Sequence, residues 1–278
     1  MSKLAEIIER QVTNAITDDE LDLPTLPEVA LRIRDAAESE NVSANSLQAV
    51  ISQDPALSGQ MIKMANSPMF RATRPIDDLN MALSRLGVEY AANLATGLAM
   101  QQMFQATSEV IDRKLRSVWS TATEIAAISG VLAKCFTALR PDQATLAGLT
   151  HSIGVLPILS WAEQHSDLLS DSMTLDRVID NIHGSLGTMI LQSWDFPPEL
   201  ALVPSSHMDL TRKVDNVDYV DVVTVATLQN IAGTEHPLTR FDWNEIQAFH
   251  NLGLDPDMES SELEEFHGDV EEAKAVFS

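Results

Sequence analysis

The chain has 278 residues, of which 45% are hydrophobic, and a formal net charge of −23. This length and content can fill a sizeable core, and the single cysteine, Cys135, excludes an intramolecular disulfide. The negative charge repels phosphate backbones and anionic headgroups, which argues against nucleic acid or a membrane as the main partner. The N-terminus lacks the apolar run of a secretory signal, and no segment approaches the roughly 18 consecutive apolar residues of a membrane span. We therefore expect a cytoplasmic protein with a buried thiol.

Apolar residues recur at three- and four-residue spacing along nearly the whole chain, beginning with the segment from Leu4 to Ile16. This spacing places them on one face of a helix, and clear β alternation is almost absent. The sequence therefore predicts an all-α protein.

Turn residues divide this pattern into several short helices within the first hundred residues, and cap chemistry gives their ends. We expect helices to begin at Thr25–Glu28, as a capping box, at Ser43–Ser46, at Asp54-Pro55 and at Asp77 or Asp78. Gly87 is expected to end the last of these helices.

Later segments give a longer helical pattern from Glu109 to Leu139, closed by Pro141, and further helices to about Leu252. From Asp255 to Ser278 there are nine acidic residues and one lysine, a net charge of −8. This end is typical of a solvated face or tail, and Glu259–Phe277 has the spacing of one more amphipathic helix.

Several short motifs occur in a fixed order along the chain. They are Leu23-Pro-Thr-Leu-Pro-Glu-Val29, Asp54-Pro-Ala-Leu57, Met64-Ala-Asn-Ser67, Leu86-Gly87, Gly148-Leu-Thr-His-Ser-Ile-Gly154, Asn181-Ile-His-Gly-Ser-Leu-Gly187 and Trp194-Asp-Phe-Pro197. Over roughly residues 15 to 235, this series closely resembles the HDOD family, a relative of the HD phosphohydrolases. The resemblance implies a multi-helix, HD-phosphohydrolase-like bundle with an N-terminal helical subdomain. It divides the chain into an N-terminal helical part (1–105), a degenerate HD-like helical part (106–236) and an acidic C-terminal helix or tail (237–278).

The resemblance also implies a metal site. HD phosphohydrolases hold divalent metals through a first histidine, a His-Asp pair and a later aspartate, because carboxylates balance the dication while the metal activates a water. Here the first histidine corresponds to Thr121, the pair to His151-Ser152, and the later aspartate to Thr227, or to Asp221 if the loops differ in length. A hydroxyl cannot replace a carboxylate that neutralises a divalent ion. We therefore expect a degenerate site with no metal or other cofactor and no catalysis.

Three histidines remain in the matching stretches, at His151, His183 and His207. We interpret them as polar or core residues held by hydrogen bonds, although three imidazoles can also bind one zinc ion with an open position. Motifs for a nucleophile elbow, a P-loop or a zincin are absent.

A small basic cluster stands out in this acidic chain. Its members are Lys63, Arg71, Arg74 and Arg85, and they suit either a phosphate-containing ligand or acidic partner, or dispersed surface charges.

These observations predict a non-catalytic signalling or scaffold module of HDOD type from a bacterium, which binds a partner protein or a small nucleotide-type ligand. The first alternative is a weak or altered metal-dependent phosphohydrolase, a phosphodiesterase that uses the three histidines with a nearby acid such as Asp180. A second alternative is a structural regulator of a homodimeric assembly.

Overall fold

The computed structural model describes residues 3–18, 20–67, 70, 74–256 and 261–277, and all regular secondary structure in these ranges is helical. The prediction of an all-α fold is therefore confirmed. In chain order the helices are α1 Lys3–Thr17, α2 Glu28–Glu38, α3 Ala44–Ile51, α4 Pro55–Ala65, α5 Leu79–Leu86, α6 Val88–Ala99, η2 Met100–Met103, α7 Glu109–Phe136, α8 Pro141–Thr150, α9 Val155–Glu163, α10 Ser166–Ser170, α11 Ser172–Ser193, α12 Pro198–Ala201, α13 Val203–Ser206, α14 Tyr219–Ile231, η3 Pro237–Arg240, η4 Trp243–Glu245, α15 Gln247–Leu252 and α16 Ser261–Phe277.

Most of the predicted helix boundaries follow from local cap chemistry. Asp54 accepts hydrogen bonds from the first amides of α4, with Pro55 in the first helical position. Ser43 and Ser46 form a reciprocal capping box at the start of α3. Asp78 caps α5, and Gly87, at φ 84°, ends that helix and precedes α6. The residues next to each of these boundaries were therefore enough to predict it.

The predicted capping box at Thr25–Glu28 is wrong. Helix α2 begins at Glu28, the cap position is held by Pro27, and no side chain caps it. A proline disfavours helical backbone in the residue before it, so the helix cannot start at Leu26. Thr25 therefore lies too far from the first turn to serve as its cap.

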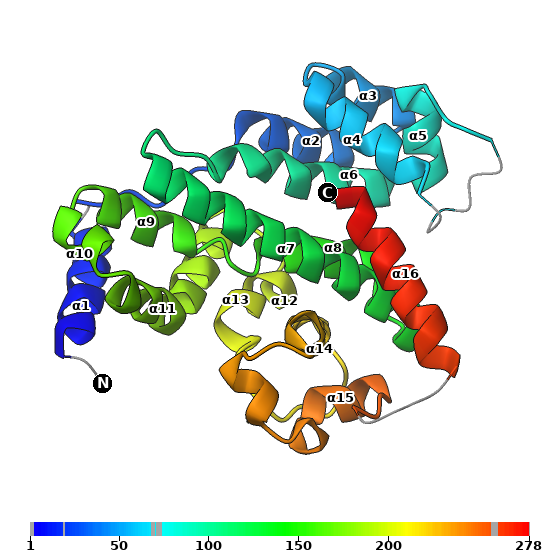
Figure 1. Cartoon of the computed structure of the whole chain (residues 1–278). Coiled ribbons are helices and arrows are strands. Elements are labelled where there is room, and N and C mark those ends of the chain that lie inside the picture. Colours follow the sequence, from blue (N-terminus) through cyan, green and yellow to red (C-terminus); the bar gives the residue numbers. More distant parts are fainter. Residues whose placement is uncertain (1–2, 19, 68–69, 71–73, 257–260, 278) are drawn as a thin grey trace.

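The helices enclose two hydrophobic cores. The smaller core is formed by α2 to α6, and the larger one by α1, α7 to α9, α11 and the helices after it. Figure 1 shows α2 to α6 on one side of the central pair α7 and α8, with α11 to α15 on the other. Helix α8 packs against both α7 and α6. The two cores therefore meet along α8.

Small residues let the central helices approach closely. A Cβ added at Gly148 in α8 would come within 2.5 Å of the Cα of Ala126 in α7. Only a residue without a side chain fits such a backbone contact. This contact fixes the position of the turn that follows α8, which carries His151 and Ser152.

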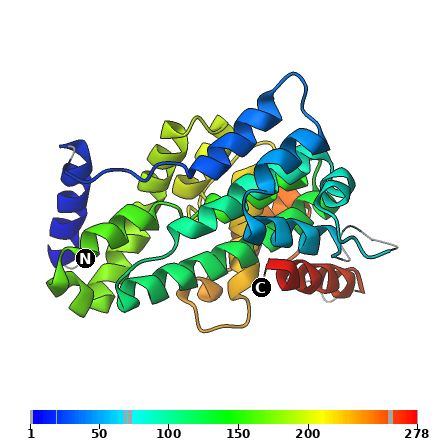
Figure 2. The same cartoon turned by 90° about the horizontal axis from the view of Figure 1, so that it is seen from above.

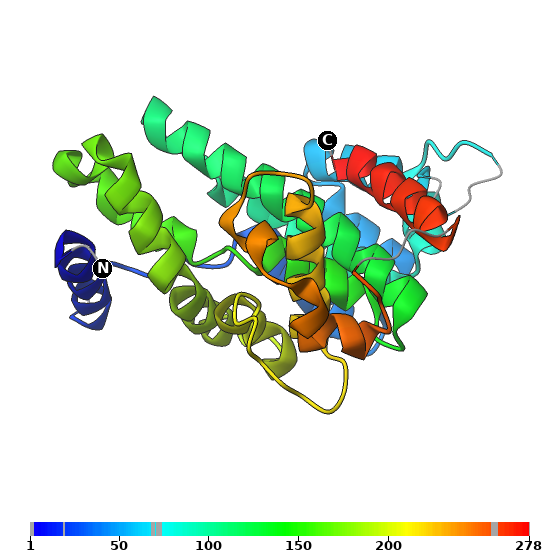
Figure 3. The same cartoon turned by 60° about the horizontal axis from the view of Figure 1, so that its bottom comes forward.

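Packing crosses one of the predicted domain boundaries. Helix α1 packs on α11 within the larger core, and not with α2 to α6 (Figure 3). The boundaries at residues 105 and 236 stay a prediction, but the first helix is part of the HD-like packing.

The acidic C-terminal segment is helical where it is described. Helix α16 packs on α7 and α4, and its Phe277 contacts both hydrophobic cores. Figure 2 places α1 and α16 at opposite ends of the molecule. Residues 259 and 260 of the predicted helix lie outside the described ranges.

The structure tests the expected burial of Cys135 and the expected lack of a membrane-spanning segment. Cys135, expected to be buried, is exposed in the last turn of α7, because the apolar face of that helix points away from it. Within the described ranges one stretch, Pro141–Glu163, has the length and hydropathy of a membrane-spanning helix, but 83% of that window is buried inside the fold. That burial is typical of a core segment, and this stretch contains α8 and α9.

Candidate functional site

A cavity of about 420 Å³ lies on the side of α7 that faces α11 and α14. Its walls come from α7, the turn between α8 and α9, α11, the residues after α13, α14 and η3. The structure brings to this cavity every residue that the resemblance placed in a former metal site: Thr121, His151, Ser152, His183, His207 and Thr227.

The three imidazoles form a cluster within this cavity. The ring centroid of His207 is 5.1 Å from that of His151 and 6.0 Å from that of His183, with the rings nearly perpendicular in both pairs. His151 and His207 are buried and His183 is half-buried. We call these three residues the histidine cluster.

Hydrogen bonds to the helix backbone fix the orientation of each imidazole. Nδ1 contacts a carbonyl oxygen three or four residues earlier, at 2.7 Å for His151 and His183 and at 3.0 and 3.1 Å for His207. A carbonyl oxygen can only accept, so Nδ1 carries the proton and donates it. In a neutral ring the lone pair is then on Nε2. The cluster therefore offers three hydrogen-bond acceptors.

Burial keeps these rings neutral. It lowers the pKa of His151 to about 4, against the bond to the Gly148 carbonyl, which favours the charged form. Burial also lowers the pKa of His207 to well below its usual value, helped by the other two imidazoles, and it lowers the pKa of His183. Desolvation disfavours a charged imidazolium. At neutral pH the cluster thus carries no charge.

Two polar atoms in the cavity wall have no partner. Ser152 Oγ and Asn230 Oδ1 are buried and make no hydrogen bond within the described part of the chain. A buried polar atom without a partner costs about 1–3 kcal/mol, so such atoms are rare and point to a missing water, ion or ligand. The hydroxyl of Thr227, in contrast, donates a hydrogen bond to the carbonyl oxygen of Val223 at 2.8 Å.

The lining does not fit the divalent-metal site of HD phosphohydrolases. Among the described residues, no group of three or more His, Cys, Asp or Glu side chains is placed to hold a metal ion. Ser152 and Thr227 bring hydroxyls where the resemblance implies carboxylates, and Thr121 is exposed. Asp180 is the carboxylate of the lining, and partial burial raises its pKa. The alternative ligand, Asp221, does not line the cavity.

Asp221 has a structural role instead. Its carboxylate accepts from Arg212 at 3.1 Å and from Asn251 at 2.8 Å, which ties the segment before α14 and helix α15 together. Both of its oxygens are therefore occupied.

Comparison with known proteins gives the family. The model of the HDOD domain matches residues 23–210. The chain belongs to the HDOD family.

Solved structures share this HDOD fold. A crystal structure from Shewanella amazonensis, described as a candidate metal-dependent phosphohydrolase, is 29% identical with a TM-score of 0.87, and the match covers 99% of both chains. An HDOD domain protein of unknown function from Geobacter sulfurreducens has 19% identity and a TM-score of 0.67, over 99% of this chain and 97% of the other. A candidate signal transduction protein from Marinobacter aquaeolei has 23% identity and a TM-score of 0.63, over 98% of this chain and 65% of the other.

A curated relative is longer than this HDOD chain. An uncharacterized protein of Treponema pallidum is 24% identical over an alignment of 241 residues, and the match covers 81% of this chain and 45% of the relative. The chain thus spans less than half the length of that relative.

Sequence reasoning missed Asn230 and His236, which also line the histidine cavity of this HDOD protein. Asn230 follows Thr227 by three residues on α14, so helical spacing places both on one face. That spacing was a usable signal. His236 lies after the end of α14, where no periodicity applies.

The predicted basic cluster does not contribute to the histidine cavity. Arg85 donates to the Phe70 carbonyl at 2.5 and 3.1 Å, Lys63 lies in the last turn of α4, and Arg74 is exposed. Arg71 lies outside the described residues. Of the described members, Lys63 and Arg85 lie in the last turns of α4 and α5, within the N-terminal helical part of the chain.

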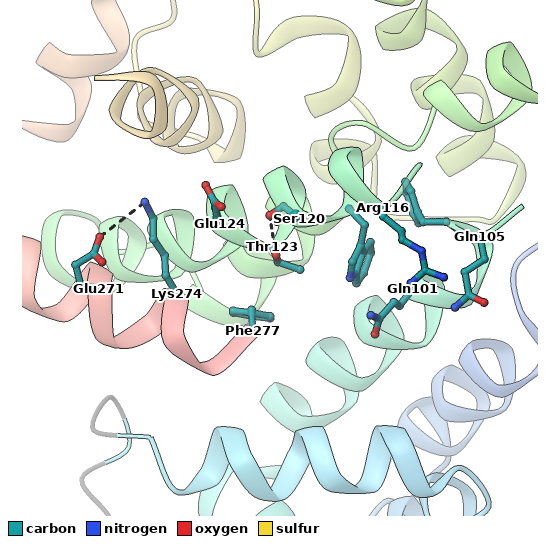
Figure 4. A pocket seen from close by; sticks show the side chains of 11 residues that line it. Gln101, Gln105, Arg116, Ser120, Thr123, Glu124, Glu271, Lys274 and Phe277 are labelled. Atoms are coloured by element: carbon teal, nitrogen blue, oxygen red, sulfur yellow. Dashed lines mark hydrogen bonds and ion pairs between the residues drawn. The ribbon is translucent and has the colours of Figure 1, made fainter. Parts of the chain in front are cut away.

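A further cavity, of about 540 Å³, lies between α7 and α16 (Figure 4). It has charged side chains of both signs, and its cations have acidic neighbours: Arg116 is 2.6 Å from Asp112, and Lys274 is 3.9 Å from Glu271. None of the residues implied by the HDOD resemblance lines it.

Proposed function

We propose that this HDOD chain is a non-catalytic binding module of bacterial signalling, acting in the cytoplasm, whose histidine cavity receives a small ligand. One observation carries the proposal. Ser152, in the place of the implied aspartate, has a buried hydroxyl with no partner beside three neutral imidazoles. The cavity has the unsatisfied polar atoms of a binding site, and at the implied metal-ligand positions Ser152 and Thr227 it lacks the carboxylates that metal-dependent hydrolysis needs.

The lining suggests the chemistry of the ligand. The histidine cluster offers Nε2 acceptors, and the described lining contains neither lysine nor arginine. A phosphate group would enter without a cation to pair with, in a chain whose net charge is −23. A ligand that carries N–H or O–H donors and no negative charge in the cavity therefore fits better than the phosphates of a nucleotide. A protein partner would then recognise the ligand-bound form through non-covalent contacts.

Metal content and turnover test this proposal together. We expect protein purified without a histidine tag, after supplementation with manganese, zinc and iron, to contain far less than one ion per chain by elemental analysis. It should also give no turnover of a phosphodiester such as bis(p-nitrophenyl) phosphate. The reason is that Ser152 and Thr227 cannot neutralise a dication.

The opposite result would favour the weak phosphohydrolase. About one or two ions per chain, lost together with turnover in a His151→Ala variant, would contradict the proposal. His250→Ala, at an exposed histidine outside the cavity, is the matched control and should change neither readout.

The unpartnered hydroxyl gives a second prediction. Ser152→Ala should stabilise the ligand-free protein by about 1 kcal/mol, because it removes a buried polar atom that has no hydrogen bond. Denaturant unfolding measures this change. Ser185→Ala, at an exposed serine of α11, is the control and should stay within about 0.5 kcal/mol of the wild type. A loss of stability in Ser152→Ala would mean that the hydroxyl has a partner in the free protein.

A further inference from the structure

A second cavity, of about 220 Å³, lies where the two hydrophobic cores meet. Helices α2 and α6 of the smaller core form one side, and α8 with the connection from α11 to α12 forms the other. We call it the junction cavity. It shares no lining residue with the histidine cavity. Small-molecule sites often occur at such interfaces between parts of a fold.

Asp195, in the wall of this cavity, has an unfavourable backbone conformation. It is the one non-glycine residue with positive φ in the described chain, at 55°. It follows the end of α11, where its amide bonds the carbonyl of Gln192 and the next amide bonds that of Leu191, as in a Schellman motif. Glycine is the usual residue at this position. Aspartate tolerates positive φ, but the carboxylate of Asp195 is exposed and has no hydrogen bond or ion pair within the described ranges, so no contact of the local fold uses its charge.

Arg34 supplies a positive charge in the same wall, and neutral groups hold its side chain in place. Arg34 donates to the carbonyl of Trp194 at 2.5 Å, and its guanidinium lies over the ring of Phe196, 5.3 Å from the centroid. Although Glu38 and Asp195 line the same cavity, no ion pair joins either of them to Arg34. A fixed cation and two carboxylates are therefore presented to the same space without neutralising one another.

Neutral polar groups complete the wall. Thr96 is only 2% exposed, and within the described chain its hydroxyl has no hydrogen-bond partner, although a helical threonine usually bonds its own backbone. The side-chain carbonyl of Gln143 accepts from Tyr219 at 2.5 Å, which leaves the amide N–H groups of Gln143 to donate. Thr96 and Gln143 thus present hydrogen-bond donors to the junction cavity.

We propose that the junction cavity binds a small zwitterion, of which a free aliphatic L-amino acid is the simplest. Its ammonium group meets Asp195 and Glu38, and its carboxylate meets Arg34 with the donors of Thr96 and Gln143. The apolar part packs on Phe196 and its neighbours. The volume corresponds to about seven waters, which suits an amino acid better than a nucleotide. Because the walls belong to both cores, the ligand joins them.

A panel of free L-amino acids, each at about 10 mM, tests this proposal on the full chain by thermal unfolding, followed by calorimetric titration of those that bind. We expect at least one aliphatic amino acid to raise Tm by about 2 °C or more, because a ligand that binds only the native state stabilises it. Its N-acetyl and methyl ester derivatives should have no effect, since each lacks one of the two charges. No shift with any amino acid, or an equal shift with the derivatives, would overturn the proposal.

Three variants locate the binding. Asp195→Asn removes the charge but keeps a side chain that tolerates positive φ, so the fold should be kept. Asp195→Asn and Arg34→Gln should each weaken binding about tenfold or more, the usual effect of losing a charged hydrogen bond. Asp215→Asn makes the same charge change at an exposed site outside the cavity and should leave binding unchanged. Binding by Asp195→Asn within about twofold of the wild type would contradict the proposed site.

Discussion

We expect Gly154→Ala to destabilise the protein by at least about 3 kcal/mol. Gly154 lies at the start of α9, and a Cβ built there would overlap the carbonyl oxygen of His183 and come within 2.5 Å of the amide nitrogen of Gly187. Both of these atoms are in the backbone of α11. They cannot rotate away as a side chain can, so the substitution must push α9 and α11 apart.

Denaturant unfolding of Gly154→Ala beside Gly59→Ala measures this effect. Gly59 is exposed within α4, and an added Cβ there meets nothing within 4 Å. Gly59→Ala should therefore stabilise the protein by about 0.5–1 kcal/mol, because alanine favours the helix. If Gly154→Ala unfolded within about 1 kcal/mol of the wild type, α9 and α11 would not be in backbone contact.

The same contact affects the histidine cavity. Ser152 lies two residues before Gly154, and His183 lies on the helix that Gly154 touches. The close approach therefore sets the separation between two walls of the cavity. In a Gly154→Ala protein that remains folded, these two walls of the histidine cavity should lie further apart.

Acid should destabilise the protein through His151, by about 3 kcal/mol between pH 7 and pH 4. Burial lowers the pKa of this imidazole from 6.5 to about 4 in the native state. Between these values the unfolded chain binds the proton and the native state does not. His151 therefore does not lower the stability above about pH 6.5. As the pH falls from 6.5 towards 4 it lowers the free energy of unfolding progressively, and below pH 4 it lowers it no further. The lowered pKa values of His183 and His207 act in the same direction.

Unfolding free energies across this pH range, measured for His151→Asn and the wild type, test the assignment. Asparagine has an amide that can replace the Nδ1–H donor to the Gly148 carbonyl, but it does not titrate. Its stability should vary less with pH than that of the wild type. His250→Asn, at an exposed histidine, should keep the wild-type slope. An unchanged slope in His151→Asn would show that other groups cause the acid sensitivity. The slope of stability against pH reports this titration even if the variant is less stable at every pH.

Much of the helical architecture follows from the sequence. Asp54, Ser43 and Asp78 cap their helices because a side-chain oxygen and the amides it accepts lie within three residues of each other. The short motifs also predicted the HDOD family, and the sequence alone shows that a serine, Ser152, follows His151. The same local reasoning failed at Thr25, where Pro27 moved the start of the helix.

The sequence by itself determined the all-α class, the family and the absence of an aspartate after His151. Only the tertiary structure decided that His151, His183 and His207 meet in one cavity, that their pKa values fall, and that Ser152 has no partner. Helical spacing states which residues share a face, but it does not state which faces pack together. Proximity across tens of residues and the loss of water from a side chain depend on that packing, and so does the charge that the site carries.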